Sequence, residues 1–90
     1  MSTLRIVIKQ PYFDQIADGS KTIEYREIKP FWESRLYDAN GKKKEYDTIE
    51  FVNGYNSDAK KMITKYEGVC RRGGLFHMFL INQSYKNQIQ

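Results

Sequence analysis

Three side chains able to hold an anion or a polar ligand lie within six residues of one another. Lys21, Glu24 and Arg26 follow Gly19, which permits the positive φ that often ends a helix. The segment 22–25 is rich in β-branched and aromatic residues and predicts a strand. Strand alternation puts Glu24 and Arg26 on one face, where they can contact each other or grip one ligand.

The opposite face of this strand carries Ile23 and Tyr25. Because both are largely apolar, we expect them to build the core and Arg26 to face a cleft or solvent. A purely structural interpretation of the polar face is an exposed ion pair between Glu24 and Arg26, worth about 0–1 kcal/mol. The remaining alternative is a pair buried inside the fold.

The rest of the chain must supply the elements that position these side chains. Apolar or alternating runs predict five strands, over residues 4–8, 21–26, 48–52, 61–68 and 75–81. Apolar residues at helical spacing predict one short helix that begins at Pro11 and ends at Gly19, and another over 31–36 after Pro30. The last strand is nearly all apolar, so we expect it to be buried on both faces.

Both helices are too short to be crossovers between parallel strands. The pattern therefore indicates a β-rich α+β fold: a small curved sheet or barrel of about five mostly antiparallel strands, capped by two short helices. The segment 37–46 reads as a polar connection with a turn at Asn40-Gly41, and 70–74 reads as a short basic turn.

Composition bounds the possible functions. Ninety residues with 40% hydrophobic and 29% charged side chains predict one soluble domain over residues 1–82, followed by a polar tail, 83–90, that we expect to fray. No apolar run approaches the ~20 residues of a membrane span, and no signal peptide is evident, so we expect a cytoplasmic protein. A formal net charge of +4 permits a polyanionic partner without demanding one.

Metal and thiol chemistry have little support. Cys70 has no second cysteine to pair with, and one cysteine with one histidine cannot build the usual zinc site. We expect no metal, no cofactor and no membrane partner.

The motif Gly-x-Lys-x-x-Glu-x-Arg after a short helix resembles the ASCH domain (activating signal cointegrator homology), a member of the PUA-like superfamily. Residues 6–13 with Ile16 are similar to that family's first strand and helix, and residues 49–55 with Ala59 and Met62 to its middle strands. The resemblance covers roughly residues 4–81. It implies a PUA-like pseudobarrel whose ligand cleft lies between the first helix and the sheet.

This resemblance implies a binding module for RNA or a nucleotide-like ligand in a basic cleft. The expected ligand-binding residues are Lys9, Lys21, Glu24, Arg26 and Tyr55. Arg26 would hold a phosphate or base edge through its planar fork, and Lys21 would supply a point charge. Glu24 would orient Arg26 or accept a hydrogen bond from a base amino group. Tyr55 opens the loop 55–60, which we expect to form one wall of the cleft.

An amidohydrolase acting on an acetylated nucleoside, such as acetylcytidine, is the alternative that the resemblance leaves open. Its lysine matches Lys21, but Glu24 occupies the position of its threonine. Its downstream glutamate lies in an insertion for which the segment 70–74 leaves no room. In an enzyme, Lys21 and Glu24 would be the catalytic residues. Because two of the three residues that act together in those enzymes have no counterpart here, we favour the binding module and expect catalysis to be absent or weak.

Other residues capable of chemistry have simpler interpretations. His77 lies in an apolar strand and reads as a core histidine rather than a catalytic one. Trp32 reads as a packed ring rather than a base-stacking one. The lysines of 42–44 read as a solvated loop rather than a phosphate contact, and Cys70 reads as an incidental thiol.

Overall fold

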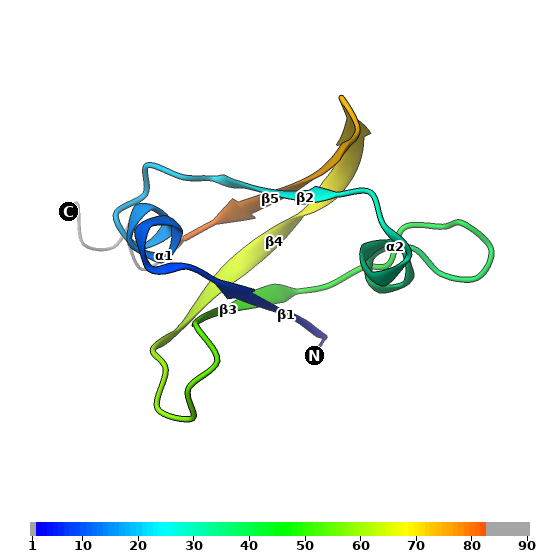
Figure 1. Cartoon of the computed structure of the whole chain (residues 1–90). Coiled ribbons are helices and arrows are strands. Elements are labelled where there is room, and N and C mark those ends of the chain that lie inside the picture. The colour runs from blue at the N-terminus through cyan, green and yellow to red at the C-terminus, as the bar shows by residue number, and fades with distance from the viewer. Residues whose placement is uncertain (1, 83–90) are drawn as a thin grey trace.

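Five strands and two helices make up the computed structural model, which describes residues 2–82 (Figure 1). In chain order they are β1 (Thr3–Ile8), α1 (Gln10–Ala17), β2 (Ile23–Glu27), α2 (Pro30–Leu36), β3 (Thr48–Asn53), β4 (Lys61–Arg72) and β5 (Leu75–Ile81). The predicted β-rich α+β class is confirmed. The predicted frayed tail, 83–90, lies outside the described residues.

Prolines start both helices, as the sequence predicts. Each helix has a proline in its first two positions, where the missing N–H needs no partner. α1 turns Phe13 and Ile16 into the core, and α2 turns in Leu36. Gly19 follows α1 with φ 86°, a conformation that favours glycine, and leads the chain into β2.

The sheet has the order β1-β3-β4-β5-β2. β1 pairs with β3 in parallel, from Thr3 opposite Thr48 to Ile8 opposite Asn53. The other three pairings are antiparallel, so the sheet is mixed but mostly antiparallel. β1 and β2 are its two edges and do not pair with each other, so the expected pseudobarrel is wrong in one respect: the sheet is not closed.

The curl of the sheet encloses the core. In Figure 1, β2 and β5 lie on one side, β1 and β3 on the other, and β4 crosses between them, while α1 and α2 stand at opposite ends. The side chains of the hydrophobic core cluster come from all seven elements except β2 and are Leu4, Ile6, Ile8, Phe13, Ile16, Leu36, Ile49, Phe51, Tyr66, Val69, Phe76, Met78 and Leu80. Trp32 packs against this core, which confirms its interpretation as a packed ring.

β2 turns the opposite face inward from the one expected. Glu24 is only 6% exposed, whereas Tyr25 is 46% exposed and Ile23 is half-buried, so a core built from Ile23 and Tyr25 is wrong. The physical reason is that β5 already fills the interior beside β2: Glu24 and Arg26 lie opposite Met78 and Phe76, both fully buried. Alternation fixes which residues share a face but not which face meets the core.

β4 also runs further than expected, to Arg72. Gly68 was expected to end the strand, but it sits at a bulge between Tyr66 and Gly68 with φ 116° and the ladder continues beyond it. The turn is correspondingly short, because only Gly73 and Gly74 connect β4 to β5, both at positive φ as a tight two-residue hairpin requires.

β5 is buried on one face only, which corrects the expectation of two buried faces. Phe76, Met78 and Leu80 point into the core, while His77 is half-buried and Phe79 is 37% exposed on the outer face. His77 is therefore not a core histidine. Its Nε2 lies 3.2 Å from the Arg72 carbonyl oxygen and, since a carbonyl only accepts, donates to it.

Candidate functional site

An open pocket of about 790 Å³ lies where the two edge strands, β1 and β2, approach the start of α1. It is lined by Val7, Ile8, Lys9, Gln10, Tyr12, Lys21, Glu24, Tyr25, Arg26, Glu27, Asn53, Gly54 and Tyr55. The five residues expected to bind ligand, Lys9, Lys21, Glu24, Arg26 and Tyr55, all line this one pocket. Segments more than 40 residues apart in the sequence thus meet at one site.

A buried carboxylate organises the pocket. Glu24 Oε2 lies 2.6 Å from Arg26 Nη2 and accepts a 2.8 Å hydrogen bond from Arg26 Nε. Glu24 Oε1 lies 3.4 Å from Lys21 Nζ. The side chain of Glu24 is 7% exposed, against 14% for Lys21 and 26% for Arg26. Both carboxylate oxygens are therefore engaged by cations of the same motif, and the Glu24–Arg26 pair is largely buried, as in the second of the two structural alternatives.

The same two cations also bond to the backbone of the edge strands. Arg26 Nη2 donates to the Val7 carbonyl at 3.1 Å and so links β2 to β1 across the gap between them. Lys21 Nζ donates to the Ile23 carbonyl at 2.7 Å. The Trp32 ring lies 5.0 Å from the Arg26 guanidinium carbon, so the guanidinium rests on α2 as well. Arg26 thus has a structural role that the sequence analysis did not assign to it.

Two tyrosine rings contact Lys21, and a third, that of Tyr55, lines the same pocket. Lys21 Nζ lies 5.6 Å from the ring centroid of Tyr12 and 5.1 Å from that of Tyr25. Tyr12 is 50% exposed and Tyr55 93% exposed, so their rings remain available to a ligand. Sequence analysis missed Tyr12 and Tyr25 because it assigned both to apolar faces. Their hydroxyl groups were the available signal, since a phenol favours a half-wet position.

The third wall of the pocket is the turn after β3. Gly54 N–H donates to the Ile8 carbonyl at 3.1 Å, and Asn53 Nδ2 donates to Gln10 Oε1. These bonds hold the turn against the start of α1. Asn53, Gly54 and Tyr55 line the pocket, but residues 56–60 do not. The expected wall is thus formed by the turn and Tyr55 rather than by the whole loop.

The electrostatic balance of the pocket is slightly positive. Its lining holds Lys9, Lys21 and Arg26 against two carboxylates, Glu24 and Glu27. Glu27 is engaged by Lys29 Nζ at 3.1 Å, on the exposed side of β2. Lys9 is exposed at the start of α1 and, among residues 2–82, makes no ion pair. An anionic group entering the pocket therefore meets a lysine whose charge is not compensated.

The lining offers little for nucleophilic catalysis. No serine, threonine, cysteine or histidine is among the described residues that line the pocket. Lys21 and Glu24, the pair expected in an enzyme, lie 3.4 Å apart but are engaged with each other, with Arg26 and with the backbone.

The described part of the chain also contains no cluster of three or more His, Cys, Asp or Glu side chains that could bind a metal ion. Within residues 2–82, no helix has the length and apolar character needed to cross a membrane.

Comparison with known proteins adds no further assignment. No protein-family model matches this chain, and neither the curated proteins nor the solved structures give a match. The resemblance to ASCH domains therefore rests on the sequence motifs, and any function must be argued from the pocket itself.

A second hollow, of about 610 Å³, lies under the connection between α2 and β3. Its lining includes the lysines of 42–44 but also three carboxylates, Glu45, Asp47 and Glu67. Lys44 Nζ donates to the Ser34 carbonyl at 2.8 Å. Because the charges of this lining cancel, it has no preference for an anion.

Proposed function

We propose that this protein is an ASCH-type, PUA-like binding module that holds RNA or a nucleotide-like ligand in the pocket between β1, β2 and α1. One observation carries the proposal: a single open pocket joins Lys9, Lys21 and Arg26 to the exposed rings of Tyr12, Tyr25 and Tyr55. Cations recognise phosphate, and aromatic rings stack on bases whatever their sequence. A nucleotide is the common ligand that has both features.

The hydrogen-bonding capacity left in the motif supports this assignment. A guanidinium has five N–H donors. Arg26 directs Nε and Nη2 to Glu24 and Val7, which leaves its two Nη1–H groups for a ligand. A lysine has three donors, and Lys21 directs one of them to the Ile23 carbonyl while its Nζ lies 3.4 Å from Glu24 Oε1 in an ion pair. Lys21, Arg26 and the uncompensated Lys9 can thus bind a phosphate together.

In the proposed complex, Glu24 does not contact the ligand directly. Both of its oxygens are engaged by cations, and its side chain is 7% exposed. In the proposed complex it orients Arg26, the first of the two roles that the sequence suggests. The base then lies among the tyrosine rings, with Tyr55, the most exposed of them, closing over it.

Titration with single nucleotides tests the proposal. Uridine and adenosine monophosphates, added to labelled protein at low salt, should shift the amide signals of Lys9, Tyr12 and Tyr55, and added salt should weaken the binding. Lys9→Ala should weaken binding by about fivefold, because a charge-assisted contact at an exposed position is worth about 1 kcal/mol. Lys9 is exposed, so the variant should fold normally.

Lys65→Ala is the matched control. Lys65 is a half-exposed lysine on β4, paired with Glu67 at 3.7 Å and outside the pocket lining. The Lys65→Ala variant should bind the nucleotide with the same affinity as the parent protein. If Lys9→Ala and Lys65→Ala lose equal affinity for the nucleotide, the binding is only a general attraction between charges. If the amide signals that shift belong to residues outside the pocket, the proposal is refuted.

A further inference from the structure

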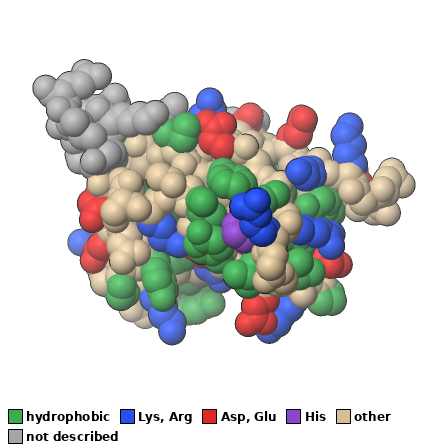
Figure 2. Space-filling model, turned by 90° about the horizontal axis from the view of Figure 1, so that it is seen from above, with side chains coloured by type: hydrophobic (Ala, Val, Ile, Leu, Met, Phe, Trp, Pro, Cys, Tyr) green, Lys and Arg blue, Asp and Glu red, His purple; other side chains and the backbone are tan. Residues whose placement is uncertain are grey.

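The outer surface of β2 and β5 carries a second group of rings, which we name the aromatic face: the exposed Tyr25 and Phe79 and the half-buried His77. Tyr25 lies directly opposite His77 in the strand register, and the two rings meet edge to face with centroids 4.8 Å apart. Phe79 lies two residues beyond His77 on the same side of β5, roughly 7 Å along the strand. Figure 2 looks onto this surface and shows the histidine among hydrophobic side chains.

The aromatic face is continuous with the pocket. Tyr25 lines the pocket, and its ring lies 5.1 Å from Lys21 Nζ, yet the same ring contacts His77 on the outer surface. This is possible because β2 is an edge strand, so a side chain on its outer face also borders the gap between β2 and β1. A ligand that leaves the pocket past Tyr25 arrives directly at His77.

Space beside Phe79 is kept open by a glycine. Phe79 is 37% exposed, and its partner on β4 is Gly68, the residue of the bulge. No atom lies within 4 Å of the position that a Cβ at Gly68 would occupy. The bulge needs glycine for its φ of 116°, and as a consequence the β4 residue opposite Phe79 contributes no side chain beside it.

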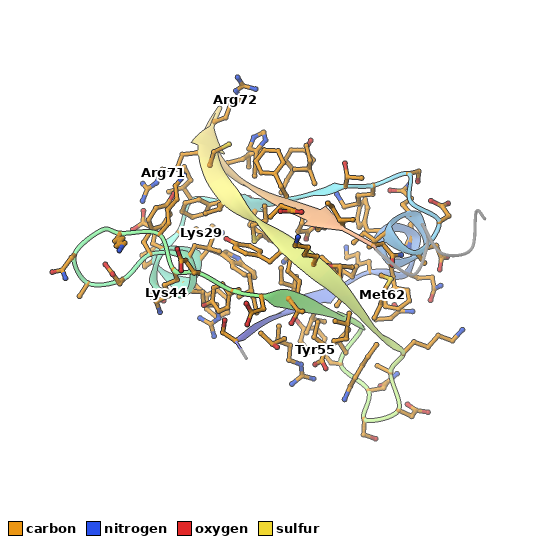
Figure 3. The ribbon with its side chains drawn as sticks, turned by 180° about the vertical axis from the view of Figure 1, so that it is seen from behind. Lys29, Lys44, Tyr55, Met62, Arg71 and Arg72 are labelled. Carbon is orange, nitrogen blue, oxygen red and sulfur yellow. The ribbon has the colours of Figure 1, made fainter. Side chains whose placement is uncertain are left out.

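Positive charge borders the Tyr25–His77 pair on two sides. Lys21 stands at the pocket end. On the hairpin side of His77, away from Phe79, the exposed Arg72 lies opposite Leu75, and its carbonyl accepts the hydrogen bond from His77. Figure 3 shows Arg72 at the tip of the β4–β5 hairpin. Rings flanked by cations match a chain of bases joined by phosphates better than they match an apolar peptide.

We infer that the ligand is a single-stranded RNA segment of several nucleotides, which runs from the pocket past Tyr25 onto His77 and along β5 to Phe79, with Arg72 beside His77 on the hairpin side. The inference rests on the proposed function for the nucleotide in the pocket and adds a stacking surface for those that follow it. Sheet faces with aromatic side chains are a general means of stacking two or three unpaired bases.

Binding measured against ligand length tests this inference. Fluorescence anisotropy with labelled oligouridylates of two, four, six and eight nucleotides, and competition by uridine monophosphate, give the affinities. Affinity should rise with length up to about four nucleotides and then level off. Phe79→Ala should weaken binding of the hexanucleotide by about tenfold, within the range known for base stacking, and leave uridine monophosphate unaffected.

Ile63→Ala is the matched control, because Ile63 is a 52% exposed apolar residue of β4 that lies outside both the pocket lining and the aromatic face. The Ile63→Ala variant should bind both the hexanucleotide and uridine monophosphate as the parent protein does. Since Phe79 and Ile63 are both partly exposed, melting curves of the two variants should stay close to that of the parent protein.

The outcomes separate the inference from the proposed function. If uridine monophosphate binds and longer chains bind no more tightly, the inference fails and the pocket assignment stands. If the hexanucleotide binds through Phe79 while the mononucleotide does not bind, the stacking surface stands and the pocket assignment fails. If Phe79→Ala leaves RNA affinity unchanged but alters self-association in sedimentation, the aromatic face is a protein interface and the inference is overturned.

Discussion

Replacing Arg26 by methionine removes the side chain that links β2 to β1 and holds the Glu24 carboxylate. Breaking a buried ion pair from one side costs roughly 3–5 kcal/mol, because the remaining charge is left without a partner. Two features reduce this figure: Lys21 Nζ still lies 3.4 Å from Glu24, and the Arg26 side chain is 26% exposed. The lost hydrogen bond to the Val7 carbonyl adds to the cost. We expect a loss of about 2–4 kcal/mol.

Urea denaturation of a double-mutant cycle measures this value. Arg26→Met, Glu24→Gln and the double variant are compared with the parent protein. Glu24→Gln should cost less than Arg26→Met, since the two cations that it leaves are more exposed and keep their carbonyl acceptors. The double variant should be more stable than the sum of the single losses implies, by about 1–2 kcal/mol. In thermal melts, Arg26→Met should lower Tm by roughly 10–20 °C.

Arg5→Met supplies the control for this cycle. Arg5 and Glu50 also form a cross-strand pair, at 3.6 Å, but the Arg5 side chain is 63% exposed. Its replacement should cost under about 1 kcal/mol. If Arg26→Met lowers the free energy of unfolding by no more than Arg5→Met does, the motif does not hold the fold together, and its cations serve the ligand alone.

Two further predictions concern buried hydroxyl groups. Within the described chain, Thr64 Oγ1 and Tyr66 Oη are buried without a hydrogen-bond partner, so Thr64→Val, which keeps the shape of the side chain, should stabilise the protein by about 1 kcal/mol in urea denaturation. Burial raises the pKa of Tyr66 to about 12, so the folded state keeps its proton at higher pH than the unfolded chain does. Stability should therefore fall as the pH rises from about 10 to about 12, more steeply in the parent protein than in Tyr66→Phe; equal slopes would contradict this.

Local signals in the sequence were enough to place most elements. Pro11 and Pro30 mark the helix starts, and β-branched runs mark β1, β2 and β3 close to their observed bounds. Gly68 misled the prediction because a glycine at a bulge and a glycine at a strand end have the same local signature. Because the strand was expected to end at Gly68, the turn was placed at residues 70–74 instead of at Gly73 and Gly74 alone.

The relations between elements were harder to predict. The parallel pairing of β1 with β3 joins residues 45 positions apart, and no local pattern encodes it. The inward direction of Glu24 depends on what β5 places beside it, so alternation alone gave the wrong core face. Conversely, residue types and spacing singled out Lys21, Glu24 and Arg26, the family resemblance added Lys9 and Tyr55, and the fold brings all five to one pocket. Whether they bind a ligand stays a prediction.

The open edges of the sheet have a consequence for behaviour at high concentration. An unpaired edge strand is a template on which another chain can add a strand, and proteins commonly block such edges with charged side chains. Here Arg26 already occupies the Val7 carbonyl of one edge, and Lys21 the Ile23 carbonyl of the other. We therefore expect the motif to oppose self-association, and folded Arg26→Met molecules should sediment as larger species as their concentration rises.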